Sequence, residues 1–138
     1  MPESESEPPY RGGCLCGKVR YVVDAKPANV RICHCRLCQK ATGCAFFARA
    51  IFPRDAVSIE GSTQAYASSE DLRRLFCPSC GTAVFAERLS RPGFLSVTLA
   101  SLDAPERLPP TMHIWVSRKI PWVVLNDGLP QFPEGAPW

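Results

Sequence analysis

The chain has 138 residues, of which 46% are hydrophobic, and its formal net charge is +3. This length fits one domain that can bury a hydrophobic core. A transmembrane helix needs about 20 consecutive apolar residues, and no segment approaches this, since even the apolar run 45–52 is interrupted by Arg49. The charge excess is small and its basic residues are scattered apart from Arg73-Arg74 and Arg118-Lys119, which argues against membrane and nucleic-acid partners.

Residues 1–9 contain three Glu and three Pro and no large apolar side chain besides Met1. Such a segment buries too little surface to fold, so we expect a disordered acidic leader over 1–9 and a single domain over 10–138. The leader also lacks the apolar core of a secretory signal. We therefore expect a soluble protein of the reducing cytoplasm, where closely spaced cysteines favour metal binding over disulfides.

The predicted elements are mostly strands. Residues 18–24 alternate Val19, Tyr21 and Val23 with polar residues, which is typical of a strand with one wet face. One helical turn is expected over 36–41 and another after Ser101, and the 14 prolines exclude long helices. The tail 130–138 either packs its aromatic residues over the sheet or frays. The sequence therefore predicts a mainly β fold, with further strands at 29–33, 44–51, 56–60, 64–67, 72–76, 82–86, 94–98 and 112–116.

The eight cysteines include two outer pairs, Cys14 with Cys16 and Cys77 with Cys80. Four sulfurs at about 2.3 Å from zinc complete a closed tetrahedral site. Residues i and i+2 of a straight strand lie too far apart for this, so the backbone between Cys14 and Cys16 must curl, helped by the flanking glycines. We expect a structural zinc site here, although each pair could instead recruit a different partner, or the first pair could complete the middle cluster.

The middle cluster supplies three thiolates, from Cys33, Cys35 and Cys38. Zinc bound by three thiolates carries a net negative charge, which disfavours water activation, and its open corner suits a substrate sulfur. Cys44 is close enough in sequence to close that corner, which would count against catalysis. The favoured interpretation of Cys44 is a small buried residue at the start of a strand.

Several motifs together resemble the glutathione-dependent formaldehyde-activating enzyme family, which includes centromere protein V. The resemblance covers nearly everything after the leader, and the order and spacing of its motifs agree. It rests on Gly12-Gly-Cys-Leu-Cys-Gly-Lys-Val-Arg-Tyr21, Cys33-His-Cys-Arg-Leu-Cys-Gln39, Phe76-Cys-Pro-Ser-Cys-Gly-Thr82, His113-Ile-Trp115, Pro121-Trp122 and Asp127-Gly-Leu-Pro130.

The resemblance implies a zinc-stapled β-tent of small antiparallel sheets with little helix. It also implies a carbon-sulfur lyase that forms or splits a thiol adduct such as S-hydroxymethylglutathione from glutathione and formaldehyde. By motif, two zinc ions are expected per chain, a structural one on Cys14, Cys16, Cys77 and Cys80 and a catalytic one on Cys33, Cys35 and Cys38. The substrate thiolate would then attack an aldehyde carbon at the catalytic zinc.

Two other functions remain open from the sequence. The first is a non-catalytic zinc module with both sites closed, whose β surface binds a protein or nucleic acid, and Cys44 is its best support. The second is a redox protein that uses Cys33 and Cys35, although zinc already accounts for those thiols. The physiological substrate, the glutathione-binding residues, the zinc occupancy and the oligomeric state are not set by the sequence.

Several other side chains could take part in the site but also have ordinary structural explanations. His34 is expected to hydrogen-bond beside the metal ligands, and His113 to be a partly buried histidine with satisfied hydrogen bonds. Arg36, Lys40 and Arg49 could neutralise the thiolates or hold substrate carboxylates, although solvated surface is the default for each. The remaining aromatic residues are expected in the core and the pocket wall, namely Phe46, Phe47, Phe76, Phe85, Phe94 and Trp115.

Overall fold

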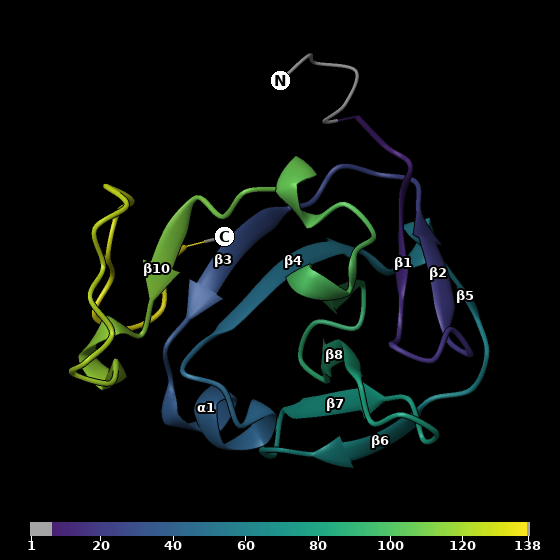
Figure 1. The fold of residues 1–138 in the computed structure, drawn as a ribbon, viewed down its shortest axis with the longest axis horizontal. Coiled ribbons are helices and arrows are strands. Elements are labelled where there is room, and N and C mark those ends of the chain that lie inside the picture. The colour runs from purple at the N-terminus through teal and green to yellow at the C-terminus, as the bar shows by residue number, and fades with distance from the viewer. Residues whose placement is uncertain (1–6, 138) are drawn as a thin grey trace.

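The structure is a computed structural model that describes residues 7–137. These residues form two sheets and one α-helix (Figure 1). The smaller sheet has three antiparallel strands in the order β1-β2-β5, with β1 at Tyr10–Gly13, β2 at Arg20–Val23 and β5 at Val57–Glu60. The mainly β class predicted from the sequence is confirmed.

The larger sheet has seven strands in the order β10-β3-β4-β9-β8-β7-β6. Its pairs are antiparallel except for β10 with β3, which is parallel. Helix α1 (Arg36–Thr42) connects β3 to β4, and short 3₁₀ helices connect other strands. The strands of this sheet are β3 (Asn29–Cys33), β4 (Phe47–Pro53), β6 (Gln64–Ala67), β7 (Leu72–Phe76), β8 (Ala83–Arg88), β9 (Phe94–Thr98) and β10 (Met112–Ile114).

The main core lies between the two sheets. Tyr21 of β2 packs edge-on against Phe85 of β8 with ring centroids 5.3 Å apart, and Tyr10 of β1 packs against Phe52 of β4 at 5.9 Å. In the larger sheet, Ala50, Val97, Phe85 and Leu75 lie opposite one another on successive strands and form one row of this core. Because side chains alternate along a strand, their neighbours in sequence point to the other face.

Gly12 allows the smaller sheet to approach the segment after β9. A Cβ atom at this position would overlap the Tyr21 hydroxyl and would lie 2.5 Å from the Ser101 carbonyl oxygen. The Tyr21 hydroxyl is itself hydrogen-bonded to Ser101 Oγ at 2.7 Å. β1 was not predicted from the sequence, because Tyr10 to Gly13 has only one large apolar side chain and two glycines.

The observed elements otherwise follow the prediction closely. β3, β6, β7 and β9 have the predicted bounds, whereas β4 begins three residues after the expected start at Cys44. Residues 1–6 of the predicted leader lie outside the described residues. Of its last three residues, Glu7 forms an ion pair with Lys26 at 2.8 Å. The described helical segments after Thr98 are all 3₁₀ helices, namely η3 (Leu99–Ser101), η4 (Pro105–Arg107) and η5 (Val116–Arg118), and the last two follow Ser101, where a helical turn was predicted.

The C-terminal segment packs against the sheet up to the last described residues. Phe132 and Ala136 contact a second apolar cluster around Cys33, Phe47 and Ile114, and Arg31 Nη1 donates to the Ala136 carbonyl at 3.2 Å. This segment and β10 lie on the side of the molecule opposite the smaller sheet (Figure 1). Trp138 lies outside the described residues.

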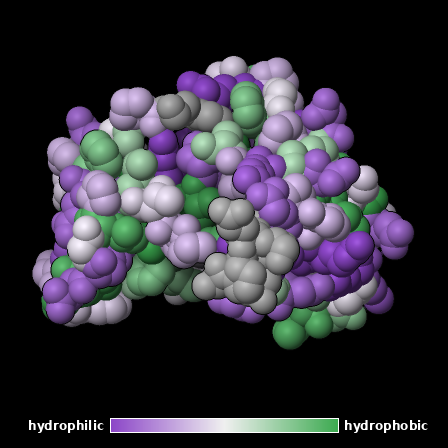
Figure 2. Space-filling view, turned by 90° about the horizontal axis from the view of Figure 1, so that it is seen from above, coloured by the Kyte–Doolittle hydropathy of each residue, from purple (hydrophilic) through white to green (hydrophobic). Residues whose placement is uncertain are grey.

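The visible face in Figure 2 intersperses hydrophilic and hydrophobic residues. Among residues 7–137 no helix is both long enough and apolar enough to span a membrane.

Candidate metal centres and the adjoining cavity

Four cysteines come together where the two sheets meet. Cys14 and Cys16 lie between β1 and β2, and Cys77 and Cys80 lie in the turn between β7 and β8. Their Sγ atoms all lie within 4.8 Å of one another, with Cys14 at 3.6 Å and Cys77 at 3.8 Å from Cys16. We call this set the four-cysteine group. Its donors are all sulfur, so it could hold a soft metal ion.

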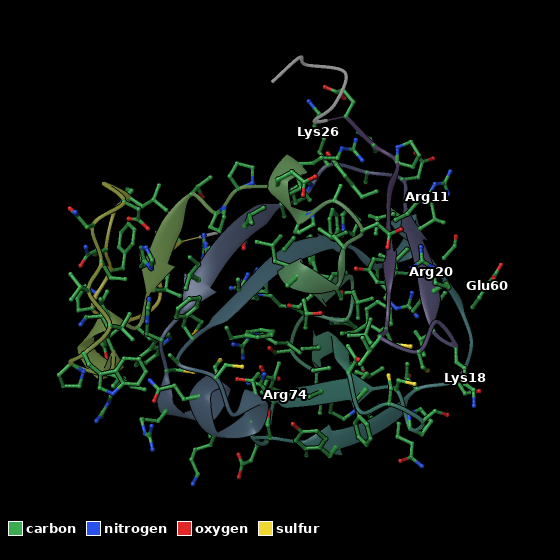
Figure 3. All side chains as sticks on the ribbon, in the orientation of Figure 1. Arg11, Lys18, Arg20, Lys26, Glu60 and Arg74 are labelled. Atoms are coloured by element: carbon green, nitrogen blue, oxygen red, sulfur yellow. The ribbon has the colours of Figure 1, made fainter. Side chains whose placement is uncertain are left out.

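Local backbone structure explains how each pair converges. Gly17 and Gly81 follow the two pairs with φ angles of +82° and +79°, a conformation that glycine adopts without steric cost. The predicted curl after Cys14 is present, since the Val19 amide donates to Cys14 Sγ at 3.3 Å. Lys18 Nζ donates to Ser79 Oγ at 3.2 Å and so bridges the two turns. Lys18 is labelled near a group of sulfur atoms in Figure 3.

The second set, the three-cysteine group, comprises Cys33, Cys35 and Cys38, whose Sγ atoms also lie within 4.8 Å of one another. Cys33 is the last residue of β3. Cys35 is the N-cap of α1, and its Sγ accepts a hydrogen bond from the Cys38 amide at 3.3 Å. The end of β3 and the start of α1 therefore place the three thiols close together. This group could hold a second metal ion.

Negative charge in the three-cysteine group is favoured at Cys35. Hydrogen bonds from the Cys33 and Cys38 thiols lower the pKa of Cys35, and the Cys38 amide and the Arg74 guanidinium act in the same direction. Hydrogen bonds with Cys35 and Cys38, together with burial, raise the pKa of Cys33. Arg74 Nη2 lies 3.4 Å from Cys38 Sγ, and this arginine is only 3% exposed. A buried cation thus faces the thiolates directly.

Cys44 does not belong to either group. Helix α1 ends at Thr42. Its C-cap residue Gly43 has a left-handed φ of +68°, and the exposed Cys44 thiol that follows contacts the Thr42 carbonyl. The expectation that Cys44 is buried at the start of a strand is wrong. Its distance from the three-cysteine group also removes the main support for a closed middle site. All eight cysteines are free thiols, and seven of them belong to the two groups.

A cavity of about 510 Å³ opens beside the three-cysteine group. Its floor is the face of the larger sheet that points away from the main core. Ile51, Ser96, Ala86 and Arg74 lie opposite one another across β4, β9, β8 and β7 and form a row along this floor. The central strands thus place their alternate residues in the core and in the cavity.

The rim of the cavity is held by contacts between α1 and the segment after β10. The buried Gln39 side-chain amide donates to the His34 carbonyl at 2.7 Å and to the Arg118 carbonyl at 3.0 Å. Trp115 has a φ of +57°, in the left-handed region that side chains rarely adopt, and this turns the chain from β10 into the 3₁₀ helix Val116–Arg118. Trp115 and Arg118 both line the cavity.

A hydrogen-bonded chain runs from the metal-binding loop toward the surface. His34 Nε2 lies 2.9 Å from His113 Nδ1, and His113 Nε2 lies 2.7 Å from Asp127 Oδ2. Both rings are buried. Burial lowers the pKa of His34, and the hydrogen bond from His113 lowers the pKa of Asp127. His34 thus has the hydrogen-bonding role that the sequence suggested, with a partner that the sequence did not indicate.

Six arginines line the cavity, and the sequence indicated only Arg36 and Arg49 of them. Lys40, the third cation considered, is exposed and does not line it. Of the aromatic residues, Phe47, Phe94 and Trp115 line the cavity and Phe85 is in the core, but Phe46 is 41% exposed and is not a core residue. The arginines that sequence reasoning missed are Arg74, Arg88, Arg91 and Arg118.

Comparison with known proteins shows the fold and the family of this chain. An uncharacterized lyase of Schizosaccharomyces pombe is 31% identical over 78 residues, which are 56% of this chain and 57% of the yeast protein, so the match spans little more than half of that relative. A crystal structure of a Rhodobacter sphaeroides protein matches with a TM-score of 0.55 and 21% identity over 88% of this chain and 98% of the other. This likeness shows a shared fold.

The family model described as glutathione-dependent formaldehyde-activating enzyme matches residues 9–118. The match includes both cysteine groups and all the described lining residues of the cavity. This chain therefore belongs to the glutathione-dependent formaldehyde-activating enzyme family.

Proposed function

We propose that this protein is a carbon-sulfur lyase that forms or splits a thiol–aldehyde adduct resembling S-hydroxymethylglutathione. The observation that carries the proposal is a group of three cysteine thiols, with no fourth cysteine in reach among the described residues, at the wall of a cavity of about 510 Å³. The family membership and the lyase name of the yeast relative support the same reaction class.

Zinc fits both cysteine groups, because sulfur donors at this spacing are its usual ligands. Cys14, Cys16, Cys77 and Cys80 would hold a structural ion, and Cys33, Cys35 and Cys38 a catalytic one. When bound at the latter, zinc supplies a Lewis acid with an open position for sulfur. Residues 10–138 would then form one zinc-binding domain in the reducing cytoplasm, in keeping with eight free thiols.

The protein's own side chains would prepare the thiol for reaction. Arg74, held by Ser68 at 3.0 Å and against Cys38, places positive charge where a substrate thiolate would develop. Phe47, Phe94 and Trp115 limit water around the reacting atoms. In the forward direction the S–H bond breaks, a carbon–sulfur bond forms, and the proton ends on the former carbonyl oxygen, so no oxidant is needed.

A Cys35→Ser variant tests this proposal. NMR exchange between formaldehyde and its glutathione adduct would be measured with wild type, with the variant and with a Cys44→Ser control, alongside zinc content. We expect Cys35→Ser to lose one of two zinc ions and the acceleration to fall on the order of 100-fold, because Lewis-acid stabilisation is worth several kcal/mol. Full acceleration and full zinc content in Cys35→Ser would overturn the proposal.

A further inference from the structure

Apart from the three-cysteine group itself, the charged side chains among the described lining residues of the cavity are all cationic. Among its described lining residues there is no aspartate or glutamate, whereas six are arginine. The whole chain has 16 basic residues and a net charge of only +3, so more than a third of its cations are concentrated on this one wall. The six are Arg36, Arg49, Arg74, Arg88, Arg91 and Arg118.

These arginines come from separate elements that converge on the cavity. Arg49, Arg74 and Arg88 project from β4, β7 and β8, on the face opposite the main core. Arg36 comes from α1 and Arg118 from the 3₁₀ helix after β10, and both are exposed at the rim. The positive charge therefore extends from the three-cysteine group to the cavity mouth.

The contacts that Arg49 and Arg36 make within the chain are with neutral groups. Arg49 Nη1 donates to the neutral Asn29 amide oxygen at 2.7 Å, and Arg36 Nη1 donates to the neutral Gln39 amide oxygen. Arg74 contacts the Ser68 hydroxyl and Cys38 Sγ, so it faces the one negative charge that zinc bound by three thiolates would carry. Burial lowers the pKa of Arg49 only to about 10, so it stays charged at neutral pH. Arg88 does face a carboxylate, Asp71, at 3.6 Å.

Glutathione is an incomplete match to this wall. It carries two carboxylates and one ammonium group, and the lining residues that the structure describes include no carboxylate to receive the ammonium. Collecting cations in a partly closed space is costly unless anions neutralise them, and arginine is suited to bidentate contacts with carboxylate and phosphate. The ligand that this cavity fits best therefore has several anionic groups and no cationic one.

We infer that the physiological thiol carries at least two carboxylate or phosphate groups and no ammonium group. This inference rests on the proposed function only in placing the thiol sulfur at the three-cysteine group. It concerns the part of the substrate away from the reacting sulfur, which the arginines would bind and orient.

Binding of three thiols to the zinc-loaded protein tests the inference. Mercaptosuccinate has two carboxylates and no amine, thioglycerol is a neutral thiol of similar size, and glutathione is the third probe. Titration calorimetry would give each dissociation constant, with zinc content measured afterwards. We expect mercaptosuccinate to bind at least about tenfold more tightly than either other thiol, since charge-assisted hydrogen bonds each contribute that much. Glutathione binding as tightly as mercaptosuccinate would overturn the inference.

A matched pair of variants localises the effect. Arg88→Gln and Arg73→Gln each remove one exposed arginine that pairs with one carboxylate, but only Arg88 lines the cavity. We expect Arg88→Gln to weaken mercaptosuccinate about tenfold and to leave thioglycerol unchanged, while Arg73→Gln changes neither by more than about twofold. Equal effects of the two variants on mercaptosuccinate would contradict the inference.

Parallel measurements of aldehyde exchange separate the two proposals. Acceleration with glutathione and no preference for mercaptosuccinate would overturn this inference and leave the lyase intact. A preference for mercaptosuccinate without acceleration for any thiol would support the ligand class and overturn the lyase. Displacement of bound mercaptosuccinate by inorganic phosphate rather than by succinate would identify the preferred anionic group as phosphate.

Discussion

The carboxylate of Asp127 is linked by hydrogen bonds to two buried imidazoles, first that of His113 and then that of His34. Its Oδ2 lies 2.7 Å from His113 Nε2, and His113 in turn contacts His34 in the loop between Cys33 and Cys35. Asp127 lies far from the cysteines in sequence, so this contact ties the C-terminal segment to the metal-binding loop. His113 and Asp127 thereby fix the orientation of His34, whose backbone amide also donates to Ile114 at 3.0 Å.

An Asp127→Asn variant is expected to lose stability in a pH-dependent way. Because the folded state lowers the pKa of Asp127, its contribution is present above the unfolded pKa of about 4 and is lost as pH falls through the folded pKa. The difference in free energy of unfolding between wild type and variant should therefore be largest at neutral pH and shrink below about pH 4. Urea unfolding at a series of pH values measures it.

The control for this prediction is Asp55→Asn, which changes an exposed aspartate in the 3₁₀ helix Arg54–Ala56. Acid also releases bound metal, but it does so equally in wild type and in both variants, so this effect drops out of the differences between their free energies of unfolding. A gap between wild type and Asp127→Asn that stays constant from pH 7 to pH 3 would count against the carboxylate's role.

At the level of elements, β1 depends on a close approach that only glycine permits. Gly12 lies against Tyr21 of β2 and the Ser101 backbone of η3, so β1 touches both its own sheet and the segment that follows β9. Backbone atoms at Ser101 cannot rotate out of the way, unlike the end of a flexible side chain. The position of β1, and with it Cys14, is set by this contact.

We expect Gly12→Ala to destabilise the fold by about 1–3 kcal/mol, because the added methyl group has no space. Gly93→Ala is the matched control, since a Cβ atom there meets no heavy atom within 4 Å. Chemical denaturation of both variants measures the difference, and identical unfolding midpoints would show that the contact at Gly12 relaxes freely.

Across the whole molecule, the four-cysteine group joins the smaller sheet to the larger one. Cys16 and Cys77 are 61 residues apart in sequence, and their sulfurs lie 3.8 Å apart. Closing a loop of this length costs about 4 kcal/mol of chain entropy. A bound metal ion at this group would offset that cost and hold the two sheets together over the core between them.

A Cys77→Ser variant should therefore lose one metal ion and about 4 kcal/mol or more of stability. Cys44→Ser, which changes an exposed cysteine outside both groups, should keep full metal content and wild-type stability. Metal analysis and thermal unfolding, with and without a chelator, measure both effects. Unchanged stability in Cys77→Ser would mean that packing alone holds the sheets together.

Much of this fold could be predicted from the sequence because its signals are local. The alternation in β2 and the short β-rich runs at β3, β7 and β9 predicted those strands, and the spacing of the cysteines predicted both groups. Local signals failed at β1, where glycines weaken the pattern, and at Cys44, which is exposed after the left-handed turn at Gly43.

The clustering of arginines in the cavity could not be predicted, because it depends on the order of the strands in the larger sheet. Alternation in β7 separates Arg73 from Arg74, but only the order β4-β9-β8-β7 brings Arg74 onto the same face as Arg49 and Arg88. These residues are far apart in sequence, and nothing local indicates which strands become neighbours. His113 and Asp127 escaped prediction as a pair for the same reason.

The alternation of the central strands also restricts how this protein can change over evolutionary time. Along β4, Arg49 and Ile51 face the cavity while Ala50 and Phe52 face the core. Point substitutions can therefore remodel ligand preference while the hydrophobic interior stays the same. Insertion or deletion of a single residue within these strands would exchange the two faces and place arginines in the core. Relatives with new substrates should thus differ here by replacement, with length changes confined to the connecting loops.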